Sequence, residues 1–130
     1  MPTFRSFEEI DAWQKARELT SQVYAASNNP SFSKDFGLRD QIRRASVSVM
    51  ANIAEGFGRS GSGEFLQFLA VAKGSACEVQ SHIYVASDKG FISKQEFERL
   101  HVLAEETSNL IGGLIRYLRQ SSVKGAKYIR

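Results

Sequence analysis

The side chains that could carry out catalysis are few and widely separated along this chain. His82 and His101 lie on different predicted helices, and neither has an H-x-x-x-H or Glu-x-x-His partner at metal-binding spacing. We interpret both as surface or interface histidines. Cys77 is the only cysteine and lacks an adjacent basic side chain, so we interpret it as a buried structural thiol. Since no nucleophile with a base emerges, we expect no enzymatic activity, no metal and no cofactor.

A line of polar side chains runs along residues 38–57, beside a line of apolar ones. The polar residues recur at three- and four-residue steps, so they share one face of a helix. We interpret this line as a structural network that fixes the register between two helices. The alternative is an acid/base pair formed by Glu55 and Glu78. The members of the predicted network are Arg44, Ser48, Asn52, Glu55 and Glu78.

Basic side chains concentrate toward the end of the chain. The net charge is +3, and residues 116–130 hold five basic side chains and no acidic one. A basic tail of this kind is typical of nucleic-acid binding, and the alternative is a solvated terminus without a ligand. Any nucleic-acid contact should go to phosphates, because no element shaped to enter a groove is recognisable. The candidate side chains are Arg39, Arg43, Arg116, Arg119, Lys124 and Lys127.

Four helices must position these side chains. No segment alternates apolar and polar residues with the period of a strand, and the loops between the periodic segments are short. Both features favour an all-α fold, an up-down-up-down antiparallel four-helix bundle. We assign residues 1–121 to the bundle and residues 122–130 to a basic C-terminal tail. The apolar periodicity predicts helices over residues 7–26, 34–57, 64–88 and from 93 onward.

The ends of these helices carry recognisable start and stop signals. Two S-x-x-E capping boxes, Ser6 with Glu9 and Ser93 with Glu96, mark the starts of the first and last helices. Pro30 is expected to stop the first helix, because proline cannot continue one. The Ser-Gly-Ser-Gly run at 60–63 lacks the order of a P-loop and a preceding strand, so it predicts a loop between antiparallel helices.

The two middle helices carry little charge for helices on the outside of a monomeric bundle. The only charged residue among residues 45–58 is Glu55, and the only charged residues among residues 65–87 are Lys73 and Glu78. A helix on the outside of a monomeric bundle should carry more polar residues on its solvent face. A stripe of small residues on the third helix would let another backbone approach closely. We interpret this stripe as an interface between subunits, and the alternative is a monomer with a weakly polar surface. The stripe consists of Ala70, Gly74, Cys77 and Ser81.

The middle of the chain carries the pattern Arg44-Ala45, Ser48, Asn52-Ile53-Ala54-Glu55-Gly56, Phe57-Gly58-Arg59, Glu64-Phe65, Phe68-Leu69, Ala72, Gly74-Ser75 and Glu78. This pattern resembles a family of small four-helix-bundle proteins encoded in intervening sequences of bacterial 23S ribosomal RNA genes. The resemblance implies the bundle fold and a ring-shaped homopentamer. It extends to accessory proteins of diversity-generating retroelements, and there it implies binding to nucleic acid and to a reverse transcriptase through a basic barrel.

Two hypotheses for function follow. The first is a non-enzymatic scaffold that forms a homo-oligomer and associates with RNA or DNA through phosphate contacts. The alternative is a protein-interaction or purely structural module without nucleic-acid binding. We expect a cytoplasmic protein without a membrane partner, because the chain has one cysteine, no signal sequence and no apolar run of roughly 18 residues.

Overall fold

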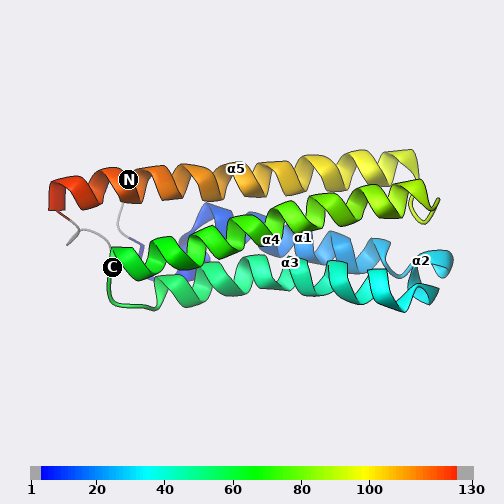
Figure 1. Cartoon of the computed structure of the whole chain (residues 1–130), viewed down its shortest axis with the longest axis horizontal. Helices are drawn as coiled ribbons and strands as arrows, with labels where there is room; N and C mark the ends of the chain where they lie inside the picture. Colours follow the sequence, from blue (N-terminus) through cyan, green and yellow to red (C-terminus); the bar gives the residue numbers. More distant parts are fainter. Residues whose placement is uncertain (1–3, 126–130) are drawn as a thin grey trace.

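Helices make up nearly all of the structure, a computed structural model that describes residues 4–125 and the side chains of residues 4–120. The described residues hold no strand, and the four long helices alternate in direction along one axis (Figure 1). The predicted all-α, up-down-up-down antiparallel four-helix bundle is therefore confirmed. The elements are η1 (Phe7–Glu9), α1 (Asp11–Ala26), α2 (Pro30–Lys34), α3 (Phe36–Phe57), α4 (Ser62–Asp88) and α5 (Lys94–Gly125).

The four long helices form a ring in cross-section. α1 and α4 each pack against both α3 and α5. At one end of the bundle lie α2, the start of α3 and the turn between α4 and α5; we call this the α2 end (Figure 1). At the opposite end lie the α3–α4 connection and the last turns of α5, which we call the loop end. No helix in residues 4–125 combines the length and apolarity needed to cross a bilayer.

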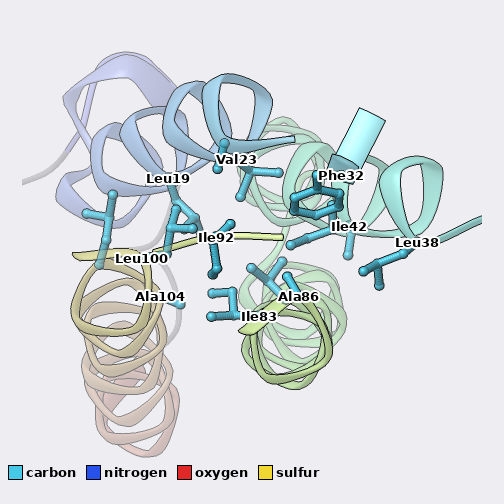
Figure 2. Close-up of a cluster of buried hydrophobic side chains, with 14 residues drawn as sticks. Leu19, Val23, Phe32, Leu38, Ile42, Ile83, Ala86, Ile92, Leu100 and Ala104 are labelled. Atoms are coloured by element: carbon cyan, nitrogen blue, oxygen red, sulfur yellow. The ribbon is translucent and has the colours of Figure 1, made fainter. Parts of the chain in front are cut away.

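The hydrophobic core fills the space between the long helices in two clusters. Figure 2 shows the cluster nearer the α2 end, which takes Leu19, Ile42, Ile83 and Leu100 from the four long helices. None of these side chains is more than 1% exposed, so each contributes about 1.5–3 kcal/mol through burial. The second cluster repeats the pattern nearer the loop end. Its fully buried members include Ala16, Val49, Leu69 and Ile111.

The first predicted capping box, Ser6 with Glu9, does not form, and the prediction is wrong. The Ser6 hydroxyl makes no capping hydrogen bond, and the Glu9 carboxylate accepts from the backbone N–H of Arg5 at 2.9 Å. The chain makes only a short 3-10 turn here, and Ile10 follows in an extended conformation with its side chain buried. Burial of Ile10 separates this turn from α1, which begins at Asp11.

The second predicted capping box is confirmed. The Ser93 backbone N–H donates to the Glu96 carboxylate at 2.8 Å, and the Glu96 backbone N–H donates to the Ser93 hydroxyl at 3.0 Å. The preceding helix, α4, ends at Asp88 and is followed by Gly90 at φ +73°, a left-handed conformation that favours glycine. The Phe91 N–H reaches back to the carbonyl oxygen of Ala86 at 2.9 Å. Together these contacts fix the turn from α4 to α5.

Pro30 acts as a start signal as well as a stop signal. α1 ends at Ala26 as expected, but Pro30 is the first residue of the short helix α2. The single helix predicted over residues 34–57 is therefore replaced by α2 and α3. The break arises at Asp35, whose carboxylate accepts from the Leu38 backbone N–H at 3.0 Å and caps α3.

α3 and α4 approach each other most closely at Gly56. A Cβ atom at this position would lie 2.6 Å from the Phe68 Cβ, a distance that real atoms do not tolerate. Gly56 lies within the last turn of α3, and the predicted short connection between α3 and α4 follows it directly. Absence of a side chain at Gly56 is thus a packing requirement of the loop end.

Candidate interaction surfaces

The polar line of α3 forms a compact hydrogen-bonded unit with the middle of α4. The Ser48 hydroxyl lies 2.9 Å from the Ser75 hydroxyl, a hydrogen bond that joins the two helices. The Asn52 side-chain amide donates to the carbonyl oxygen and the hydroxyl of Ser48, at 2.8 and 3.0 Å. All three side chains are half-buried. The network predicted from the sequence did not include Ser75. The signal that could have found it is its position directly before Ala76, which is buried.

The charged members of the predicted network do not join this unit. Glu55 pairs with Arg59 at 2.9 Å, and Glu78 pairs with His82 at 3.2 Å, each one turn away on the same helix. The prediction of one network that includes Glu55 and Glu78 is wrong, because exposed charged side chains meet neighbours on their own helix instead. These pairings also give no support to an acid/base pair between the two carboxylates.

Arg44 is likewise outside the hydrogen-bonded unit. Its side chain is exposed and makes no hydrogen bond or ion pair with any residue whose side chain the structure describes. It borders a shallow depression that it shares with Tyr24, Asp40, Arg43 and Val47. The prediction that Arg44 belongs to the structural network is therefore wrong.

The small-residue stripe of α4 faces outward. Gly74 and Cys77 are exposed, as are Ala70 and Ser81, and a Cβ at Gly74 would meet nothing within 4 Å. The prediction that Cys77 is a buried thiol is wrong for the single chain. Large apolar side chains flank the stripe with unusually high exposure. They are Val71 at 53%, Tyr84 at 51% and Val85 at 40%.

Arg43, near the α2 end, is held by contacts within the chain. Its Nε donates to the Ser27 hydroxyl at 2.7 Å, and one terminal nitrogen donates to the Asn28 side-chain oxygen at 2.9 Å. Its guanidinium carbon lies 4.6 Å from the centre of the Tyr24 ring. These contacts join the start of α3 to the end of α1, so Arg43 is a structural residue of the bundle.

Arg39, one turn earlier on α3, is also engaged. It pairs with the Asp40 carboxylate at 3.1 Å and donates to the carbonyl oxygen of Ser33 at 3.2 Å. Its guanidinium stacks 4.9 Å from the centre of the exposed Phe36 ring. Both predicted phosphate-binding arginines of α3 therefore already have partners within the chain, which leaves fewer of their N–H groups free to bind a ligand.

The predicted phosphate-binding arginines of α5 lie at the other end of the bundle. Arg116 and Arg119 are exposed, and neither makes a hydrogen bond or ion pair with a residue in the described part of the chain. Lys124 belongs to the last turn of α5, but its side chain lies outside the described residues, as does all of Lys127. The start of α3 and the last turns of α5 lie at opposite ends of the bundle, so the candidates on these two segments do not form one patch on a single chain (Figure 1).

The α2 end contains the one carboxyl group with a clearly shifted pKa in the described part of the chain. Partial burial alone raises the pKa of Glu96, but hydrogen bonds from the Ser93 backbone, the Asn29 side chain and the Ser93 hydroxyl, together with nearby Arg99, lower it below its usual value. The Asn29 amide also donates to the carbonyl oxygen of Phe91 at 3.0 Å. Asn29 and Glu96 thus tie the start of α2 to the turn between α4 and α5.

The described side chains offer no cluster for a metal ion, and the groove between α1 and α5 offers little to a phosphate. Within residues 4–120, no three His, Cys, Asp or Glu side chains lie close enough to share a metal ion. A shallow groove of 510 Å³ between α1 and α5 is lined by three carboxylates, those of Glu18, Glu98 and Glu106, against one arginine, Arg99. Its negative charge would repel phosphate groups. Nucleic-acid contact is therefore disfavoured on this face.

Fold and surfaces together define a class: an all-helical bundle with an exposed apolar face and a few unpaired cations. The comparison with protein families is more specific, because residues 8–113 match the 23S rRNA-intervening sequence proteins. The chain belongs to this family, as the resemblance of its middle segment indicated. No curated protein matches the chain.

Among solved structures, the chain is similar to a protein of unknown function from the S23 ribosomal protein family of Bacteroides thetaiotaomicron. The TM-score is 0.73 at 22% sequence identity, and the match covers 80% of this chain and 97% of the other. At this identity the likeness establishes the shared fold.

Proposed function

We propose that the protein is a non-enzymatic scaffold that assembles into a homo-oligomer and associates with nucleic acid through phosphate contacts. The observation that carries this proposal is the division of its surface. α4 presents an apolar, nearly uncharged face, and Arg116 and Arg119 of α5 have no carboxylate partner among the described residues. The first suits another protein surface, and the second suits phosphates.

The assembly would use the outer face of α4 together with α3. Val71 and Tyr84 each leave about half of their surface in water, which favours burial by a neighbouring subunit. The small residues between them leave room for a second helix to approach. We expect five copies, the number implied by the family resemblance, arranged so that each subunit repeats the same contacts.

The nucleic-acid contact would use Arg116 and Arg119 together with Lys124 and Lys127. Arg116 and Arg119 have no partner among the described residues, so they give up only water when they bind a phosphate. Repetition of these side chains around a ring would turn the modest charge of +3 per chain into a strong local field. Affinity should fall steeply with salt and depend little on sequence.

A second candidate function rests on the apolar face alone. Exposed Val71, Tyr84 and Val85 are equally suited to a different protein, such as a reverse transcriptase, or to a purely structural assembly. This candidate predicts a stable complex without any affinity for RNA or DNA.

Light scattering of a dilute sample tests the assembly. We expect a mass several times the 14.5 kDa of one chain. Gly74→Arg should reduce the mass to that of the monomer while the helical content stays unchanged. Ala25→Arg, which places the same side chain on an exposed position of α1, should leave the assembly intact. A parent protein with a mass near 14.5 kDa would contradict the proposed oligomer.

Titration with single-stranded RNA at several salt concentrations tests the second half of the proposal. Replacement of Lys124, Lys127 and Arg130 together should lower the slope of log affinity against log salt by up to about three. Complete absence of RNA and DNA binding by the intact oligomer at low salt would remove the nucleic-acid function and leave the second candidate.

A further inference from the structure

Two cations from different helices converge above one glycine of α5. The position where Gly112 would carry a Cβ lies 3.6 Å from a terminal nitrogen of Arg116 and 3.8 Å from the Lys73 ammonium nitrogen. Arg116 reaches this point from one turn further along α5, and Lys73 reaches it from α4. Like charges repel, so the approach of both to one point calls for an explanation.

Neither cation is neutralised within the described chain. No carboxylate there forms an ion pair with Lys73 or Arg116, although ion pairs hold other cations of the protein, such as Lys15. Lys73 instead donates to the Ser108 hydroxyl at 3.0 Å. The two positive charges therefore have no anionic partner among the described residues, and an anion bound between them would be attracted to both.

Ser108 adds a hydrogen-bond donor to the same place. Its side chain is buried, with 7% of the residue exposed, and it accepts from Lys73. Its hydroxyl hydrogen donates to no residue in the described part of the chain. A ligand that accepts hydrogen bonds could therefore use the hydroxyl as a third donor.

The glycines beneath the cations are not explained by the fold. Gly112 and Gly113 lie inside α5, where each glycine costs about 1 kcal/mol relative to alanine. Neither has a φ in the left-handed region, where Gly90 is the only described glycine. A Cβ at Gly112 would meet nothing closer than 3.6 Å, in contrast to the 2.6 Å clash at Gly56. What Gly112 leaves is space directly beneath the two charged groups.

We propose that Lys73, Ser108 and Arg116 form a seat for a phosphate group over Gly112. The ammonium supplies a point charge, the planar guanidinium can donate two parallel hydrogen bonds, and the hydroxyl donates a third. A phosphate oxyanion satisfies all of these donors and neutralises both cations. The inference deepens the proposed function, because Arg116 belongs to both, and the phosphate could be a free ion or part of a nucleic-acid backbone.

Calorimetric titration of the intact oligomer with inorganic phosphate, at constant ionic strength in chloride, tests the seat itself. Lys73→Gln and Arg116→Gln should each raise the Kd for phosphate at least about tenfold, since each removes a charge-assisted hydrogen bond. Lys94→Gln is the matched control, because Lys94 is exposed at the start of the same helix and takes no part in the proposed phosphate contacts. It should leave the Kd for phosphate within about twofold.

Gly112→Ala separates ligand binding from stability. Alanine should maintain or raise the melting temperature, because it is the better helix former and fits without a clash. Its methyl group would occupy the floor of the seat, so we expect the Kd for phosphate to rise about tenfold as well. A melting temperature that falls while phosphate binding is unchanged would overturn the inference and assign the glycine a packing role.

Parallel titration with an oligouridylate distinguishes the two sources of phosphate. Weaker RNA binding by Lys73→Gln, with or without binding of inorganic phosphate, supports a seat for backbone phosphates. Binding of inorganic phosphate through Lys73 and Arg116, without RNA binding, supports the seat and removes the proposed nucleic-acid function. RNA binding that is unaffected by Lys73→Gln, in a protein that does not bind inorganic phosphate, overturns the seat and leaves the proposed function standing.

Discussion

The two ends of the bundle use their arginines in opposite ways. At the α2 end, Arg43 bridges α3 to the end of α1 through Ser27 and Asn28. Toward the loop end, Arg116 and Arg119 have no hydrogen bond or ion pair with the described residues. A cation that already satisfies a buried partner would destabilise the fold if it left, whereas an unpaired cation gives up only water. The comparison teaches that availability, more than charge, decides which basic residues can bind a ligand.

The ends also differ in what holds them together. Polar side chains tie the α2 end, where Asn29 and Glu96 connect α2 to the turn between α4 and α5. Close apolar contact holds the loop end, where α4 packs against Gly56. Substitutions at the two ends should therefore destabilise the fold for different physical reasons. The loss in the free energy of unfolding should follow the size of the contact that each substitution removes.

Gly56→Ala should have the largest effect on stability. Its new methyl group would lie 2.6 Å from the Phe68 Cβ, so α3 and α4 must move apart. We expect a loss of about 2–3 kcal/mol in the free energy of unfolding, measured by denaturant titration. Gly63→Ala, at an exposed position of α4 with nothing within 4 Å, is the control and should be neutral or stabilising. Equal stability of both variants would show that the close approach at the loop end is not required.

Arg43→Gln should have the next largest effect. It removes the contacts of the guanidinium with Ser27, Asn28 and Tyr24, for an expected loss of about 1–2 kcal/mol in the free energy of unfolding. Arg44→Gln removes the same charge from an exposed neighbour and should change stability by less than about 0.5 kcal/mol. If the two variants unfolded alike, Arg43 would be as available for a ligand as Arg116.

Glu96→Ala should cost about 1 kcal/mol through loss of the capping box at the start of α5. Because the pKa of Glu96 is lowered in the folded protein, its ionised form contributes stability that is fully present above the usual value of 4.5. This contribution is lost as the pH falls through the lower folded value. The stability difference between the parent and Glu96→Ala should therefore narrow in acid.

Glu9→Ala is the matched control for Glu96→Ala. Glu9 occupies the equivalent position in the other S-x-x-E pattern, but its carboxylate accepts only from the backbone N–H of Arg5. We expect a change below about 0.5 kcal/mol at any pH. A large loss at Glu9 would mean that the first capping box forms in solution.

The sequence was sufficient to predict the bundle because periodicity is a local property. Leu69, Ala76 and Ile83 recur with helical spacing and are fully buried. The two S-x-x-E patterns show where local reasoning ends: both carry the same residues, yet only Ser93 and Glu96 form a box, since burial of Ile10 displaces the first helix start.

The interaction surfaces were harder to predict, because partners on other helices depend on how far one helix slides along the next. Sequence spacing placed Ser48 and Asn52 together correctly. It could not show that Ser48 meets Ser75, or that Lys73 meets Ser108. Long side chains such as Arg44 and Glu78 reach in many directions, so their position on a helical wheel did not determine their partners.

The most direct test of the central claim compares two double variants in RNA binding at several salt concentrations. Arg116→Gln with Arg119→Gln should weaken binding and lower the slope of log affinity against log salt by about one to two, as expected for two lost phosphate contacts. Arg39→Gln with Arg43→Gln, assayed well below its melting temperature, should leave that slope unchanged. The reverse result, in which the α3 pair changes the slope and the α5 pair does not, would contradict the account.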